Sequence, residues 1–424
     1  MSARSLRVLG WLGLTVGVWL GAGELSFKVT TDKPDALYQP GDQMVFSIQL
    51  QDDGKPVAGQ ELRWWRRGDD QQEAKGTLTS QAEPVVVTTA LAAPGFVRLT
   101  VTAYDGNGQP CKDAKGREVC FEGGAGVAPE RLQTVAEPQD FDAFWQKQKA
   151  ALAVVPLKVE MKPLAVQNPL LVGFDIKVDC AGGKPVSGYF AKPKEARPKS
   201  LPALASFHGY GVGSAVLRED PKMLTLDINA HGIENGQPKE FYEALRNGEL
   251  KDYAFSNTDA PDKSYFLGMF LRVQRALQFL EAQPEWDGVN LIVTGGSQGG
   301  LQALVAAGLD TRVTFCMANL PWCCDLGGIT LGRQRGWRPE YTPAMGYFDP
   351  ANHIKRTQAF VLMDAGLGDY VCPPSGISAL FNNIPSANKK LVTIQGGTHG
   401  YTPPGSRTAW SEYGACLAKT LKPQ

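Results

Sequence analysis

The sequence predicts two domains of different classes, a small β-sandwich followed by a larger α/β domain with a mainly parallel sheet. Hydrophobic residues alternate with polar ones through residues 24–126, and beyond that point buried strands are interleaved with helices. A period of two is typical of half-buried strands, whereas strands alternating with helices indicate a parallel sheet with helices on both faces. The chain has 424 residues, 43% of them hydrophobic, which is enough for two cores.

The first 23 residues have the pattern of a signal peptide. Arg4 and Arg7 precede an apolar run over residues 8–20, and small residues follow at 21–23. A membrane anchor is the alternative, but the run is short for a bilayer span. We therefore expect a secreted or periplasmic protein with no membrane attachment after signal cleavage. The balance of 43 basic and 43 acidic residues gives no indication of nucleic-acid binding.

Residues 24–126 are expected to form an immunoglobulin-like sandwich. The alternation is clearest at residues 44–50 and 97–101, and Pro-Gly or Asp-Gly turn signals occur near residues 40, 53, 94 and 105. Two adjacent tryptophans, Trp64 and Trp65, have two interpretations. They form either a sugar-stacking platform or the more usual pair of one core residue and one partly exposed residue.

The eight cysteines permit disulfides in an exported protein. We predict one pair, Cys111 with Cys120, because they bracket a polar segment resembling a hairpin loop whose closure costs little entropy. Two free thiols are the alternative. Cys323 and Cys324 are adjacent and are not expected to bond to each other. Because no cysteines and histidines cluster at ligand spacing, we expect no metal, and nothing implies an organic cofactor.

The α/β domain is expected over residues 127–424, after a linker formed by the Gly-Gly-Ala-Gly run at 123–126. A first helix is predicted from Glu137-Pro138, with its apolar residues mostly on one face. A strand of the buried kind follows at 203–207, and the segment 265–282 has one apolar stripe, which predicts a further helix.

The most informative motif is Gly-Gly-Ser-Gln-Gly-Gly at 295–300, directly after the apolar stretch 291–294. A serine that points its Oγ out of a sharp strand-to-helix turn needs neighbours without bulk, which explains the glycines around Ser297. Short motifs of this kind also occur by chance. The order of residues along the chain supports Ser297 as a nucleophile, because Asp369 and His399 follow it in the Ser, Asp, His order of α/β-hydrolases.

Among the four histidines, His399 is the best candidate for the base. It lies in a glycine-bounded loop after the strand predicted at 391–394, where its imidazole can reach a serine on a neighbouring loop. His231 and His353 are expected to be structural or surface residues. For the acid, a loop carboxylate beyond a strand end suits histidine better than one at the strand end itself, so Asp369 is preferred to Asp364.

An oxyanion hole is predicted from two backbone N–H groups. Gln298 would begin the helix after the serine, where N–H groups are unpaired and the helix dipole favours negative charge. Tyr210 would supply the second N–H from the loop at 207–210, which also contains His208.

Seven segments carry a resemblance to a known family. They are Glu-Pro-Gln-Asp-Phe-Asp at 137–142, Phe-Trp at 144–145, Phe-His-Gly-Tyr at 207–210, Gly-Gly-Ser-Gln-Gly-Gly at 295–300, Leu-Pro-Trp at 320–322, Tyr-Phe-Asp at 347–349 and Gly-Leu-Gly-Asp-Tyr-Val-Cys-Pro-Pro at 366–374. From about residue 135 onward the chain resembles carbohydrate esterase family seven, the acetyl xylan esterases and cephalosporin C deacetylases. The last segment discriminates best, because many hydrolases share a serine elbow and few share that acid loop.

The resemblance implies an α/β-hydrolase fold and a serine esterase that deacetylates carbohydrate. It implies Ser297 as nucleophile with Asp369 and His399 as partners, and it suggests Tyr210 and Pro321 as walls of a narrow acetyl pocket. Two departures put the exact substrate and the family's ring-shaped oligomer in doubt. Ala-His-Gly stands at 230–232 where the family usually has Arg-Gly-Gln, and glycine stands at 400 where it usually has glutamate.

The expected function is therefore removal of acetyl groups from an O-acetylated oligosaccharide or polysaccharide. One alternative is a prolyl-oligopeptidase-like peptidase, which would need a propeller or a much longer β-region. Another is a non-catalytic carbohydrate-binding protein on a hydrolase scaffold. Because every candidate catalytic residue lies after the glycine run, the α/β domain is predicted to keep some activity without the sandwich.

Overall fold

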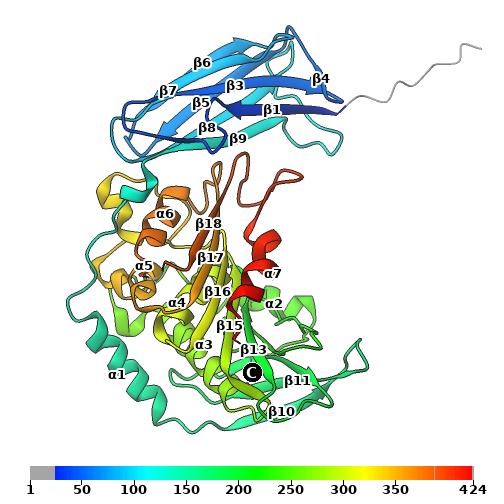
Figure 1. Cartoon of the computed structure of the whole chain (residues 1–424), viewed down its shortest axis with the longest axis vertical. Helices are drawn as coiled ribbons and strands as arrows, with labels where there is room; N and C mark the ends of the chain where they lie inside the picture. The colour runs from blue at the N-terminus through cyan, green and yellow to red at the C-terminus, as the bar shows by residue number, and fades with distance from the viewer. Residues whose placement is uncertain (1–23, 386, 423–424) are drawn as a thin grey trace, which may run out of the picture.

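A computed structural model describes residues 24–385 and 387–422, so the predicted signal peptide lies outside the described residues. Figure 1 shows two domains in contact, with the sandwich stacked on one end of the α/β domain and the sheet that contains β9 turned toward it. Within the described ranges, no helix is both long and apolar enough to cross a membrane.

The N-terminal domain is a sandwich of one four-stranded and one five-stranded sheet, which confirms the sandwich prediction. Buried residues of β3, such as Phe46, face buried residues of β8, such as Leu99, across a single core. A sandwich of this size is not the propeller that the peptidase alternative requires. The first sheet contains β1 (Leu25–Thr31), β3 (Gln43–Asp52), β4 (Lys55–Pro56) and β7 (Val85–Ala90), and the second β2 (Leu37–Tyr38), β9 (Cys120–Val127), β8 (Gly95–Tyr104), β5 (Glu61–Gly68) and β6 (Glu73–Thr79).

The predicted disulfide is wrong, because Cys111 and Cys120 are separate thiols. The Val119 N–H donates to the Cys111 carbonyl, so Cys111 is opposite Val119 and Cys120 is one residue out of register. Side chains alternate between the faces of a ribbon, so the two sulfurs point to different sides. Cys111 packs against the sandwich core, whereas Cys120 lines the cleft between the domains.

The tryptophan pair is half-buried and offers no open stacking platform. Trp64 packs against the sandwich core. Trp65 lies on the outer face, with the Arg67 guanidinium 3.9 Å and the Lys75 ammonium 4.4 Å from its ring centroid. These cations cover the Trp65 ring surface on which a sugar ring would stack, which disfavours the sugar-stacking interpretation.

The second domain is an α/β sheet in the order β10-β11-β12-β14-β13-β15-β16-β17-β18, parallel from β14 to β18 and antiparallel over β10 to β12. The mainly parallel sheet confirms the fold class. Its strands are β10 (Val159–Leu164), β11 (Leu171–Val178), β12 (Val186–Pro193), β13 (Leu201–Phe207), β14 (Leu224–Ile228), β15 (Trp286–Gly296), β16 (Val313–Asn319), β17 (Phe360–Gly366) and β18 (Lys389–Ile394). Its helices are α1 (Phe141–Ala153), α2 (Lys239–Asn247), α3 (Tyr265–Glu281), α4 (Gln298–Leu309), α5 (Pro350–His353), α6 (Pro374–Asn382) and α7 (Ala409–Thr420), with short 3₁₀ turns at Pro129–Arg131, Pro261–Lys263, Leu326–Leu331, Pro343–Tyr347 and Ile354–Arg356.

Helices cover both faces of this sheet. Leu291 and Val293 of β15 belong to the large core that includes α3 and α4, whereas Ile292 between them belongs to the smaller core under α7. Successive side chains of a strand point to opposite faces, so a continuous apolar run is what a sheet buried on both sides requires.

The glycine run predicted as a linker is instead part of strand β9, paired with β8. Its glycines allow the backbones of the two domains to touch. A Cβ on Gly124 would lie 2.7 Å from the Leu367 carbonyl oxygen, and one on Gly368 would lie 2.3 Å from the Glu122 carbonyl oxygen. The side chain of Leu367, from the α/β domain, is buried in the sandwich core. The two domains therefore share packing at this junction.

Candidate active site

Ser297 lies at the sharp turn between β15 and α4, with φ 54° and ψ −118°. This left-handed backbone conformation is strained for a serine and is maintained by close packing around it. A Cβ on Gly295 would lie 2.3 Å from Gly299, and one on Gly299 would lie 2.0 Å from the Phe207 carbonyl oxygen. The two glycines predicted from the motif are thus required by contacts that any larger residue would break.

His399 lies between the serine and a carboxylate. Its Nε2 is 3.0 Å from the Ser297 Oγ, and its Nδ1 is 3.0 Å from the Asp369 Oδ2. The loop after β18 carries the histidine, and the loop after β17 carries the aspartate. The structure therefore brings together the three predicted residues from positions up to 102 residues apart.

The two candidate acids have different surroundings. Asp369 accepts the backbone N–H groups of Val371 and Cys372 on its Oδ1, which leaves Oδ2 for the imidazole. Asp364 is fully buried and accepts two bonds from the Asn319 amide and the backbone N–H groups of Leu320 and Ala409. Burial raises the pKa of Asp364, while those bonds oppose the change. Asp364 therefore holds the end of β16 and the start of α7 in place, and Asp369 is the carboxylate at the histidine.

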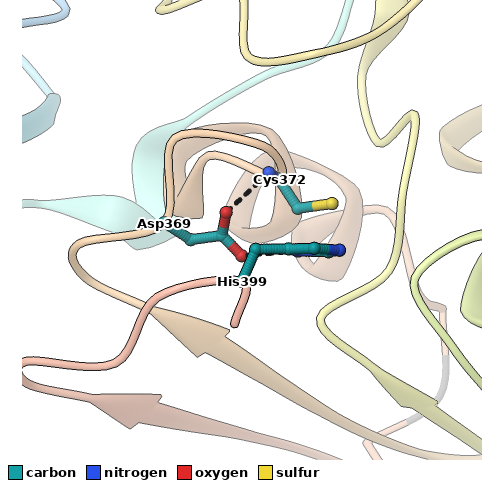
Figure 2. A group of neighbouring side chains, drawn as sticks. All are labelled: Asp369, Cys372 and His399. Carbon is teal, nitrogen blue, oxygen red and sulfur yellow. Dashed lines mark hydrogen bonds and ion pairs between the residues drawn. The ribbon is translucent and has the colours of Figure 1, made fainter. Parts of the chain in front are cut away.

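Figure 2 shows the buried thiol of Cys372 beside this pair. Asp369, Cys372 and His399 each have one potential metal-ligand atom within 4.8 Å of the others, so the group is a candidate metal site. The donor chemistry does not suit a metal well. Both Asp369 oxygens and the His399 Nδ1 are already engaged, and burial raises the pKa of Cys372 well above its usual value. A neutral thiol is a weak ligand, so the group is better described as the hydrogen-bonded Asp369–His399 pair beside a buried cysteine.

The segments that carry the predicted oxyanion donors pass next to the serine. Gln298 is the first residue of α4, so its N–H has no acceptor within the helix. The loop that contains Tyr210 passes the elbow closely, because a Cβ on Gly209 would lie 3.8 Å from the Ser297 Cβ. His208 fixes this loop: its Nδ1 is 2.7 Å from the Gly209 carbonyl and its Nε2 accepts the Ala230 N–H.

The other two histidines are structural, as predicted. His231 is buried between the Gly211 carbonyl, 2.8 Å from its Nε2, and the Tyr265 hydroxyl, and burial lowers its pKa to about 4. It thereby ties the Tyr210 loop to α3 at the position where this chain departs from the family motif. His353 is fully buried against the Tyr347 carbonyl, and burial lowers its pKa to about 3.

Aromatic side chains that the sequence analysis did not identify enclose the oxyanion side. Tyr210 stacks on Tyr253 with ring centroids 4.6 Å apart and meets Trp337 edge-on at 4.8 Å. Trp337 in turn stacks on the buried Trp322, which follows the predicted pocket residue Pro321. Tyr253 also donates its hydroxyl to the Gln298 side chain. Local sequence gave no signal for Tyr253 or Trp337, because neither belongs to one of the motif segments.

Gln395 was also missed, and it connects the histidine loop to the sandwich. Its amide accepts the Gly124 N–H at 3.0 Å and donates to the Gly124 carbonyl at 2.8 Å, as a neighbouring strand would. The glycines at 123–126, predicted as a linker, could have indicated this contact, since glycine also marks close approach of another chain segment.

Comparison with known proteins adds an independent finding. The model of a family described as acetyl xylan esterase (AXE1) matches residues 131–413. A curated relative, the acetyl esterase Axe7A of Xylanibacter ruminicola, is 30% identical over 292 residues, which is 63% of this chain. The match spans 65% of that relative's length.

Solved structures agree on the fold of the α/β domain. The acetyl xylan esterase from Paenibacillus sp. R4 is 25% identical, with a TM-score of 0.56 over 69% of this chain and 98% of its own. Acetyl xylan esterase 1 from Thermoanaerobacterium sp. JW/SL YS485 is 23% identical, with a TM-score of 0.53 over 69% of this chain and 96% of its own. Matches over 69% of this chain leave nearly a third of it, about the length of residues 1–126, without a counterpart in these two structures.

Proposed function

Because the chain belongs to the acetyl xylan esterase (AXE1) family, we propose that it is an exported serine esterase that removes acetyl groups from O-acetylated carbohydrates. One observation carries the proposal. The His399 imidazole connects the Ser297 Oγ to the Asp369 carboxylate through two contacts of 3.0 Å. This is the arrangement that activates a serine hydroxyl for attack on an ester.

In the first half-reaction, Ser297 Oγ attacks the acetyl carbonyl carbon while His399 Nε2 takes the hydroxyl proton. The carbonyl oxygen becomes an oxyanion, which the N–H groups of Gln298 and Tyr210 stabilise. Collapse of this intermediate breaks the bond to the sugar oxygen, and His399 returns the proton to that oxygen. The products are a free sugar hydroxyl and an acetyl group on Ser297.

In the second half-reaction, His399 takes a proton from water, and the resulting hydroxide attacks the acetyl-serine. The Ser297 Oγ then leaves with the proton from His399, and acetate is released. Asp369 accepts the Nδ1–H throughout, so the imidazole stays in the tautomer whose Nε2 faces the serine. The scheme uses water together with side chains and backbone N–H groups of this chain.

Two further features support the proposal. Tyr210 is half-buried among Tyr253, Trp337 and Phe255, so its ring is held in place as a wall of the proposed acetyl pocket. Export is supported by the signal-peptide pattern of residues 1–23, which would place the enzyme where polysaccharide is found.

A fluorophosphonate probe tests the nucleophile directly. We expect it to label the parent protein and not Ser297→Ala, and a screen of acetylated xylan, pectin, mannan and small acetylated sugars to release acetate with at least one substrate. A folded parent protein that neither reacts with the probe nor releases acetate would favour a carbohydrate-binding protein on a hydrolase scaffold instead.

A further inference from the structure

A cleft of about 860 Å³ separates the outer face of the sandwich from the α/β domain. Strands β5, β8 and β9 form one side, and the segments at 329–336 and 370–373 form the other. Pockets of about 300–1,000 Å³ enclose drug-sized ligands, so this one can hold a short oligosaccharide. The mechanism described above makes no use of it.

Contacts between the domains fix the cleft at both ends. At one end, Gln395 binds the backbone of Gly124 in β9. At the other, the Asp69 carboxylate accepts the Gln334 N–H at 2.9 Å, and the Gln71 amide donates to the Gly332 carbonyl. The space between these anchors is therefore set by the fold and does not depend on a loose domain contact.

The cleft lies beside the acid loop. Tyr370 lines it and directly follows Asp369, and its side chain is 56% exposed. The Arg98 guanidinium lies 5.0 Å from the Tyr370 ring centroid and supports that ring from the sandwich side. An exposed aromatic ring held in this way is a surface on which a sugar ring can pack.

The opposite wall offers a cation. Arg67 of β5 lies over the Trp65 ring, and its Nε–H is buried without an acceptor in the described part of the chain. Burial and the neighbouring Arg98 hold the pKa of Arg67 below its usual value. Arg98, whose Nε–H is likewise buried without an acceptor among the described residues, pairs with Glu122, and Arg333 pairs with Asp325. The Arg67 guanidinium lines the cleft and has no hydrogen bond or ion pair among the described residues, so its terminal N–H groups, which are not buried like Nε, can bind a ligand carboxylate.

We propose that this interdomain cleft binds the glycan chain next to the acetylated sugar, with Tyr370 under a sugar ring and Arg67 bonded to the carboxylate of a uronic acid. The site rests on the proposed function, because it assigns the substrate class to an acetylated glycan that carries uronic-acid groups. Thr100 and Gln334, which also line the cleft, offer polar groups to sugar hydroxyls.

Binding to an inactive protein tests the site apart from catalysis. In a Ser297→Ala background, calorimetry compares an oligosaccharide that carries one uronic acid with the neutral oligosaccharide of equal length. We expect the acidic probe to bind more tightly, and added Arg67→Gln to weaken its binding about tenfold while changing the neutral probe less than twofold. Rising salt should weaken only the acidic probe.

Lys75→Gln is the matched control. Lys75 also places its cation over Trp65 but lies outside the cleft, so its loss should leave both affinities unchanged. Tyr370→Ala should weaken both probes by a similar factor. Absence of binding by either probe, or equal affinities that Arg67→Gln and salt leave unchanged, would overturn the proposal. Nitrophenyl acetate turnover by the parent protein tests the esterase proposal separately.

Discussion

The two halves of the candidate triad depend on different parts of the molecule. The Ser297 elbow is packed against β13 and its following loop, so everything that positions it belongs to the α/β domain. The loops of Asp369 and His399 instead contact β9 of the sandwich through Leu367, Gly368 and Gln395. The difference indicates that the candidate nucleophile is positioned within its own domain, whereas the loops of the candidate acid and base are held partly by a second domain.

The largest expected effect is at the acid itself. Asp369→Asn should leave the fold intact but lower kcat by a factor on the order of 10⁴, because an amide favours the wrong tautomer of His399. Asp364→Asn, within strand β17 before the Asp369 loop, should lose stability and little rate, since it alters a fully buried carboxylate that binds backbone N–H groups. Steady-state kinetics and melting temperatures of both variants measure this contrast, and a reversed pattern would mean that the acid is wrongly assigned.

The next effect tests whether the sandwich positions the acid loop. Gly368→Ala would place a Cβ 2.3 Å from the Glu122 carbonyl oxygen, so the acid loop and β9 must move apart. A displacement of about 1 Å at a catalytic group can cost roughly a hundredfold, and we expect a fall of that order in kcat for nitrophenyl acetate.

Gly106→Ala is the control for this substitution, because a Cβ there meets nothing within 4 Å. It should leave both kcat and melting temperature unchanged. If Gly368→Ala also left kcat and melting temperature unchanged, the position of the acid loop would not depend on β9. That result would support the sequence-based prediction that the α/β domain keeps activity without residues 24–126.

These contacts also explain what could be predicted from sequence. The Ser297 elbow was recognised because its steric requirement is local: glycines two residues either side of the serine are demanded by the turn itself. The glycines at 123–126 were interpreted as a linker because glycine favours flexible segments. Their actual role, close contact with Leu367 and Gln395, depends on a partner about 240 to 270 residues away, which no local pattern contains.

The disulfide between Cys111 and Cys120 failed for a related reason. The short loop makes the entropy cost of ring closure small, but strand register decides which face each side chain occupies. A shift of one residue places the two sulfurs on different faces.

The choice of Asp369 over Asp364 rested on the position of Asp369 in a loop beyond the strand end. The four hydrogen bonds that make Asp364 structural come from Asn319, Leu320 and Ala409, distant elements that sequence could not bring together.

A smaller effect is expected on the nucleophile side, where the acyl group would bind. Tyr210 is held between Tyr253 and Trp337, and Pro321 is buried, so neither can move easily to admit a longer chain. Overpacking such a site costs about 1–3 kcal/mol, and kcat/KM should fall roughly tenfold to a hundredfold from acetyl to butyryl nitrophenyl esters. Equal rates for acetate and octanoate would contradict a narrow pocket.

The smallest effect should appear at Gln395, which links the histidine loop to β9. Gln395→Ala removes two hydrogen bonds to Gly124 and should cost about 1–2 kcal/mol of unfolding free energy, with a fall in kcat of less than tenfold because Asp369 still orients His399. Gln49→Ala is the control, since it loses two glutamine bonds within the sandwich, one to the Ala82 carbonyl and one from the Gln51 amide, and should leave kcat unchanged. Denaturant unfolding and nitrophenyl acetate kinetics measure both variants. A fall in kcat in Gln395→Ala but not in Gln49→Ala would indicate that the sandwich helps to position the His399 loop as well as the Asp369 loop. Equal kcat values for the two variants would indicate that only the Asp369 loop depends on the sandwich.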